Sequence, residues 1–196
     1  MKIPLTPDSY PRILKRVKEA GFKTFEAQNF DMNIIGERNP NGEADKFDDW
    51  IHVCFLENDE WQWHAFKCTT DPGIYYLKKA ATAILVHDRQ YRGAFKLGKH
   101  RGKYEALVQT GNKVNIWRDR NKDNKIDLGS DEISGYFGIN IHRANSKRVS
   151  QIVGPHSAGC QVIQDPEEYK TFIELCKLQV QYLGYKKFTY TLLMGE

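Results

Sequence analysis

Short segments in which apolar and polar residues alternate constrain the fold of this chain more than any other feature. The clearest is residues 61–69, where Trp61 and Trp63 fall on one face and His64 and Phe66 on the other. A period of two is typical of a half-buried β-strand. Similar patterns predict further strands at residues 32–36, 50–55, 82–86, 94–97, 106–109, 113–118, 136–142 and 188–193. We therefore expect a β-dominated fold.

Two segments with a helical period frame these strands. Residues 11–20 place Ile13 and Val17 on one face, and residues 166–182 begin with an Asp165-Pro166 pair that is typical of a helix N-terminus. The expected class is α+β: a mixed sheet or β-sandwich with an N-terminal helix and a C-terminal helix plus strand. A tight turn at residues 110–112 predicts a hairpin between the strands on either side of it.

The chain is expected to form one domain over residues 1–196, because it contains no repeat and no linker. Within it, residues 1–35 carry the first helix and a lead-in strand, and residues 80–196 carry the candidate chemistry. Hydrophobic residues at 40% and charged residues at 28% exclude a disordered or fibrous protein. No apolar run reaches the roughly 18 residues of a membrane span. A net charge of +4 is mild and disfavours nucleic acid as the partner.

The first residues and the cysteines bear on the compartment. The N-terminal sequence lacks the apolar stretch of about 7–15 residues of a secretory signal, so synthesis in a cytoplasm without a signal peptide is expected. The four cysteines are widely spaced and form no Cys-Xaa-Xaa-Cys pair. This spacing argues against a disulfide framework and against a four-sulfur zinc site.

One cysteine has the neighbours of a nucleophile. Cys160 follows Gly159, and it comes after a predicted strand that ends at His142. A cysteine nucleophile needs a base to supply its thiolate, for which His142 and His156 are the candidates. The glycine permits a tight turn whose N–H groups face an oxyanion. The alternative is that Cys160 is a small core residue and His142 a solvated strand end.

The same residues resemble the L,D-transpeptidase catalytic domain, a cysteine acyltransferase of bacterial peptidoglycan. The resemblance rests on Ile141-His142-Arg143 and on Ser157-Xaa-Gly159-Cys160, with histidine and cysteine 18 positions apart. It implies His142 as the base, the Arg143 backbone carbonyl as its orienting group, Cys160 as nucleophile and the Gly159 backbone as oxyanion donor. Asn140, His156, Ser157 and Gln161, which lie next to these residues in the sequence, are the candidate substrate contacts.

The resemblance implies a cysteine transferase or an L,D-carboxypeptidase or endopeptidase that acts on peptidoglycan stem peptides and needs no catalytic cofactor. Whether an amine or water accepts the acyl group stays open. With no signal peptide expected, a phage-encoded enzyme, carried in a virion or otherwise delivered to the host periplasm, is favoured, with virion proteins as further partners. The alternative is a non-catalytic virion or cell-wall-binding module that keeps the fold. Ala158 and Val162, which replace polar residues of the family pattern, favour this alternative.

A second motif suggests a structural calcium ion. Oxygen ligands at alternate positions of an EF-hand-like loop would come from Asp119, Asn121, Asp123, the Lys125 backbone carbonyl and Asp127. Ile126 occupies the apolar position of such a loop, and Ser130 stands where the usual bidentate glutamate would be. The alternative is a solvated turn, because lysines in the loop offset part of its charge.

Overall fold

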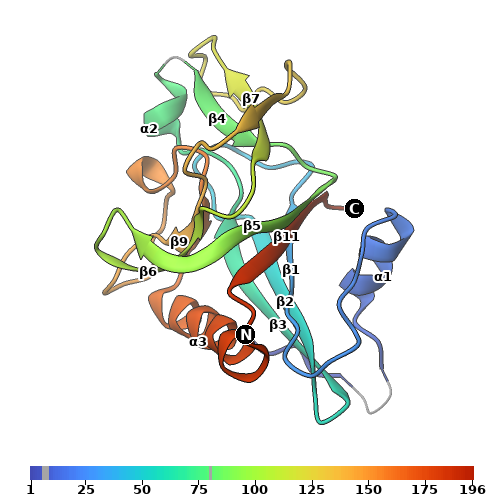
Figure 1. The fold of residues 1–196 in the computed structure, drawn as a ribbon. Coiled ribbons are helices and arrows are strands. Elements are labelled where there is room, and N and C mark those ends of the chain that lie inside the picture. The colour runs from blue at the N-terminus through green and yellow to red at the C-terminus, as the bar shows by residue number, and fades with distance from the viewer. Residues whose placement is uncertain (6–8, 80) are drawn as a thin grey trace.

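A closed barrel forms the main body of the computed structural model, which describes residues 1–5, 9–79 and 81–196 (Figure 1). Its strands are β1 (Asn33–Arg38), β2 (Asp49–Glu57), β3 (Glu60–Thr69), β5 (Arg89–His100), β6 (Tyr104–Gln109), β9 (Ile141–Arg143), β10 (Gln161–Ile163) and β11 (Lys187–Met194). They follow the order β1-β11-β5-β6-β9-β10-β3-β2 around the barrel. β1 and β11 pair in parallel, as do β9 and β10, and the other pairs are antiparallel, so the sheet is mixed.

A second sheet lies at one end of the barrel, opposite the C-terminal helix (Figure 1). It consists of β4 (Thr82–Leu85), β7 (Val114–Asp119) and β8 (Ile133–Gly135), with β7 in the middle. Ile84, Val86 and Trp117 form a small core of their own on this sheet.

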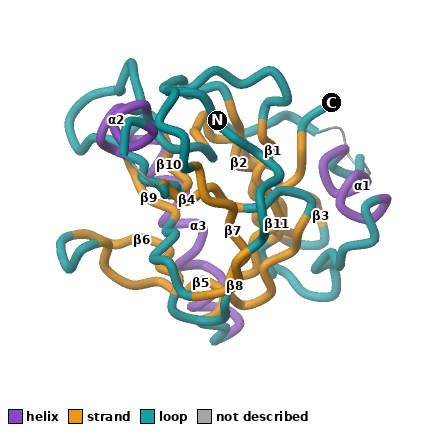
Figure 2. The backbone as a smooth tube through the Cα atoms, turned by 90° about the horizontal axis from the view of Figure 1, so that it is seen from above, coloured by secondary structure: helices purple, strands orange, loops and turns teal. Residues whose placement is uncertain are grey.

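Two helices cover different parts of the barrel. α1 (Arg12–Glu19) buries Ile13, Leu14 and Val17 against β1, β2 and β11. α3 (Pro166–Leu183) begins where the Asp165 side chain accepts the Glu167 N–H and ends at Gly184 in the left-handed conformation. The short helices α2 (Ile74–Leu77) and η1 (Gly154–His156) contact each other, and Figure 2 shows α1 and α2 on opposite sides of the strands.

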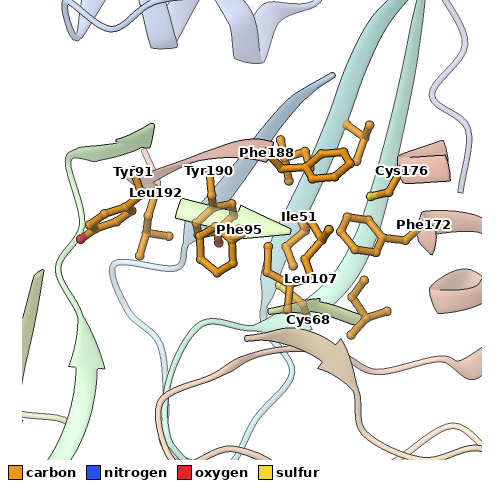
Figure 3. Close-up of a cluster of buried hydrophobic side chains, with 14 of the residues drawn as sticks. Ile51, Cys68, Tyr91, Phe95, Leu107, Phe172, Cys176, Phe188, Tyr190 and Leu192 are labelled. Carbon is orange, nitrogen blue, oxygen red and sulfur yellow. The ribbon is translucent and has the colours of Figure 1, made fainter. Parts of the chain in front are cut away.

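The hydrophobic core fills the barrel between its strands and α3. Phe172 and Cys176 from α3 meet Phe188 from β11 and Ile51 from β2, and Phe95 packs edge to face on Tyr190 (Figure 3). Burial of large apolar side chains contributes most of the stability of such a core, at about 1.5–3 kcal/mol for each.

The expected class is confirmed: the fold is β-dominated α+β, with a mixed sheet, an N-terminal helix and a C-terminal helix followed by a strand. The sheet closes on itself and does not form two facing layers. Residues 6–8 and 80, which belong to the expected segments 1–35 and 80–196, lie outside the described residues. Within the described ranges, no helix is both long and apolar enough to cross a bilayer.

Two local expectations were wrong. Residues 136–142 are not one strand, because β8 ends at Gly135 and β9 begins at Ile141. The turn at residues 110–112 does not close a hairpin, because β6 lies in the barrel and β7 in the second sheet. Gly111 donates its N–H to Ala94, and a Cβ there would come within 1.9 Å of the Gly93 carbonyl oxygen. This close approach lets the chain cross from one sheet to the other.

Candidate active site

The parallel pair β9 and β10 brings the two halves of the motif together. Val162 lies opposite His142, and Gln161 donates its N–H to the Asn140 carbonyl at 2.9 Å. Cys160 directly precedes β10. It lies two residues before Val162, the residue that pairs with His142. Strand geometry then sets the Cα atoms of Cys160 and His142 roughly 8 Å apart. Residues 18 positions apart in sequence thus become neighbours in space.

The side chains of His142 and Cys160 lie on the outer face of these strands. Ile141 and Ile163 point into the main core of the barrel. Successive residues of a strand alternate between faces, so His142 and Cys160 take the opposite side. Consistently, Cys160 and Val162 pack in a separate apolar cluster outside the main core. The alternation that fills the core therefore also places the candidate site outside the barrel.

The turn before Cys160 is held by Ser157 and Gly159. Gly159 has φ +113°, and a Cβ there would lie 2.3 Å from the Ala83 carbonyl oxygen of β4. The Ser157 hydroxyl accepts the Gly159 N–H at 3.1 Å and donates to the Cys160 carbonyl at 2.8 Å. The conformation and the close approach to β4 both require glycine at this position.

His142 is held by the backbone of the next residue. Its Nδ1 lies 2.9 Å from the Arg143 carbonyl oxygen, and the Tyr104 hydroxyl donates to the same oxygen at 3.3 Å. A carbonyl only accepts, so Nδ1 carries the proton and Nε2 presents a lone pair. This is the orientation that the resemblance implies for the base.

The surroundings of His142 keep its ring neutral. The residue is 3% exposed, and the His100 ring stacks on it with centroids 4.0 Å apart. Burial, reinforced by the neighbouring His100, lowers the pKa of His142 to about 3, against the opposing effect of the Arg143 carbonyl. At neutral pH the imidazole is an uncharged proton acceptor.

Cys160 is partly exposed, whereas Cys54, Cys68 and Cys176 are buried. Burial of its sulfur raises the pKa of the Cys160 thiol above its ordinary value, and the Asn140 N–H at 3.4 Å opposes this shift. The thiol also donates to the Gly138 carbonyl at 3.6 Å. The resting pair is therefore a neutral thiol beside a neutral imidazole, and not the preformed thiolate that the sequence suggested.

This charge state predicts how the thiols react. Native protein treated with iodoacetamide should be labelled at Cys160 alone, and the other three thiols should react only after unfolding. Because the thiolate is the nucleophile, the rate should rise about tenfold per pH unit below the raised pKa. Mass spectrometry of labelled peptides against pH measures this. Fast, pH-independent labelling between about pH 5 and pH 7 would instead indicate a preformed thiolate.

A basic groove adjoins His142. A cavity of about 190 Å³ is lined by His142, His156, Arg101, Lys103 and Arg143 among others, but not by Cys160. A neighbouring cavity of about 440 Å³ shares Lys103 and Arg143 with it and adds Lys99 and Lys170. The Arg143 guanidinium stacks over the Tyr104 ring at 4.0 Å. The larger cavity also carries Glu105, Glu167 and Glu174, so it is the smaller cavity beside His142 that offers a cationic surface for a carboxylate-bearing ligand.

The expected substrate contacts divide into two groups. His156 lines the cavity beside His142. The Asn140 side chain is already bonded to the Gln109 N–H and to His100. Ser157 and Gln161 are each 0% exposed, so they hold the chain and cannot touch a substrate, which corrects the expectation. The Gly159 N–H is likewise engaged by Ser157, as described above, so it is not free for an oxyanion.

A buried polar network supports Gln161 from inside the barrel. Gln161 donates to the Thr70 carbonyl at 3.3 Å, and Thr70 donates its N–H and hydroxyl to Asp49. Arg38, 1% exposed, donates to Thr70 and lies 3.1 Å from Asp71. Burial raises the pKa of both carboxyl groups, and Arg38 opposes the shift. This network fixes the residue that follows Cys160.

Sequence reasoning missed His100 and Tyr104. They face each other across the β5–β6 hairpin, at its closing end, and both touch His142. A signal was present, since the basic run at residues 96–103 contains two glycines and is flanked by alternating residues. Nothing local in it indicated which strand the hairpin would pair with.

Comparison with known proteins does not identify the chain: no protein family, curated protein or solved structure matches it. Among the described residues, no three His, Cys, Asp or Glu side chains are grouped closely enough to hold a metal ion.

Proposed function

We propose that this protein is a cysteine acyltransferase or hydrolase of the L,D-transpeptidase type that acts on peptidoglycan stem peptides. The observation that carries the proposal is the orientation of the His142 ring on β9: its Nδ1 is held by the Arg143 carbonyl, and Cys160 directly precedes the adjacent strand β10. That arrangement leaves Nε2 as a base on the same face as the sulfur. Delivery of the protein by a phage particle belongs to this proposal.

The chemistry follows from the neutral pair. As the sulfur attacks an amide carbonyl, the thiol proton passes to His142 Nε2, and the oxyanion takes a hydrogen bond from the backbone N–H of Cys160. His142 then returns the proton to the leaving amine, the C–N bond breaks and a thioester remains on Cys160. An amine or water attacks the thioester and gives its proton to His142, the C–S bond breaks, and the departing thiolate takes that proton from His142, which restores the neutral pair.

The groove supports an anionic peptide as the substrate. Stem peptides carry free carboxylates, and Lys103 and Arg143 lie in the wall shared by both cavities. Arg143 is well suited to this contact because its planar guanidinium binds a carboxylate with two parallel hydrogen bonds.

The experiment is incubation of the protein with purified muropeptides, with and without a free D-amino acid as acceptor, followed by mass spectrometry. We expect loss of the terminal residue in water and exchange with the added amino acid. Cys160→Ala should abolish both, and Cys54→Ala, at a buried thiol, serves as the matched control. Absence of any product and of a thioester adduct on Cys160 would contradict the proposal.

The second candidate is a non-catalytic wall-binding module. The raised pKa of the Cys160 thiol and the absence of Cys160 from the lining of the cavity favour it. This candidate predicts that wild type and Cys160→Ala sediment equally with purified cell walls, and that neither changes the muropeptides.

A further inference from the structure

The loop between β7 and β8 contains a buried carboxylate oxygen without a partner. Asp119, the last residue of β7, is 0% exposed. Its Oδ2 accepts the Asp127 N–H at 3.4 Å, whereas its Oδ1 has no hydrogen-bond partner among the described residues. A buried acceptor left unpaired is costly, so this oxygen calls for a ligand.

Further side-chain oxygen atoms belong to the same loop. The Asn121 amide donates to Asp127 at 2.6 Å, and the Asp123 carboxylate accepts the Lys125 N–H at 2.8 Å. These bonds curl the loop around the end of β7. A cation in the loop would offset the repulsion among the like-charged carboxylates of Asp119, Asp123 and Asp127.

The rest of the loop is fixed to the second sheet. Ile126 packs on the core of Ile84, Val86 and Trp117. Ser130 accepts the Arg118 N–H through its hydroxyl. The Glu132 carboxylate is bound to Arg89 and Asn115, so it is not available as a ligand. Ser130 and Glu132 are thus engaged elsewhere, and the candidate ligands are those of the first nine positions of the loop.

We propose that this loop binds a calcium ion through five protein ligands. These are the side-chain oxygens of Asp119, Asn121, Asp123 and Asp127 and the backbone carbonyl of Lys125. Binding requires the Asn121 side-chain amide to turn, so that its oxygen takes the place of the nitrogen that now lies beside Asp127. It also requires the carboxylates of Asp119, Asp123 and Asp127 to move closer together. Calcium accepts six to eight oxygens in irregular geometry, so water completes the shell, whereas magnesium demands a near-ideal octahedron. Without a bidentate glutamate, we expect a dissociation constant of about 10⁻⁴–10⁻³ M.

The test is the melting temperature of the whole chain with and without calcium. At about 10 mM calcium we expect the Tm to rise by about 3–10 °C, and magnesium to give a much smaller rise. Asp119→Asn should lose the rise, yet without calcium it should melt no lower than wild type, because it removes an unpaired buried charge. Asp59→Asn, an equal charge change in the exposed β2–β3 turn, should keep the full rise.

Terbium luminescence provides a second readout. Ile126 of the loop packs on the cluster that contains Trp117, so excitation of tryptophan should sensitise bound Tb³⁺, and calcium should displace it. Trp117→Phe should remove most of the emission while the calcium-induced rise in Tm persists. The proposal is overturned if calcium leaves both the Tm and the Tb³⁺ emission unchanged, or if Asp119→Asn shows the same rise as wild type.

Discussion

Replacing His142 with glutamine is expected to lower the rate of the proposed acyl transfer by about 10²–10⁴, the usual contribution of a general base. Glutamine can still donate to the Arg143 carbonyl, but it cannot take the thiol proton as the sulfur attacks. Because the resting thiol is not ionised by His142, the rate at which iodoacetamide alkylates Cys160 should change by no more than a few-fold. Product formation from muropeptides and alkylation, measured side by side, separate the two effects.

The control is His87→Gln, at a histidine bound to Asp88 and outside the site, which should keep full activity. If His142→Gln lowers alkylation and catalysis by the same factor, then the imidazole ionises the thiol at rest. If it lowers neither, His142 is not the base. Unchanged near-ultraviolet circular dichroism of the variant would show that its packing is intact.

Replacing Arg38 with methionine is expected to destabilise the fold by about 3–5 kcal/mol, because it leaves two buried carboxylates without their cation. Arg38 lies 3.1 Å from Asp71 and is linked to Asp49 through Thr70. Methionine fills a similar volume, so the loss reports charge and hydrogen bonding more than packing. Urea unfolding at neutral pH measures the difference.

The effect should depend on pH in a defined direction. The folded-state pKa values of Asp49 and Asp71 are already raised, and loss of Arg38 raises them further. A carboxyl group with a raised folded-state pKa destabilises the fold once it ionises, so the deficit should shrink as the pH falls and the groups are protonated. Arg89→Met, at an exposed ion pair with Glu132, should cost less than about 1 kcal/mol at every pH. A pH-independent deficit in Arg38→Met would contradict this account.

Much of the local structure could be predicted from the sequence. Alternation located most strands because one face of each lies against the core, and the Asp165-Pro166 pair placed the start of α3 within one residue. The carbonyl contact of His142 followed from the family resemblance. The prediction of a hairpin at residues 110–112 failed because a tight turn has the same sequence pattern whether the chain folds back on its own strand or crosses to another sheet.

What the sequence by itself determined is the β-dominated class and the framing helices, and it proposed His142 and Cys160 as candidate catalytic residues, because periodicity and motif spacing are local properties. Tertiary structure alone decided that the barrel closes and that β9 lies beside β10, with His100 and Tyr104 from the β5–β6 hairpin against His142. It also decided the charge state of the pair. A pKa depends on burial and on neighbouring groups from distant segments. The burial of the Asp119 oxygen likewise depends on segments that are distant in the sequence.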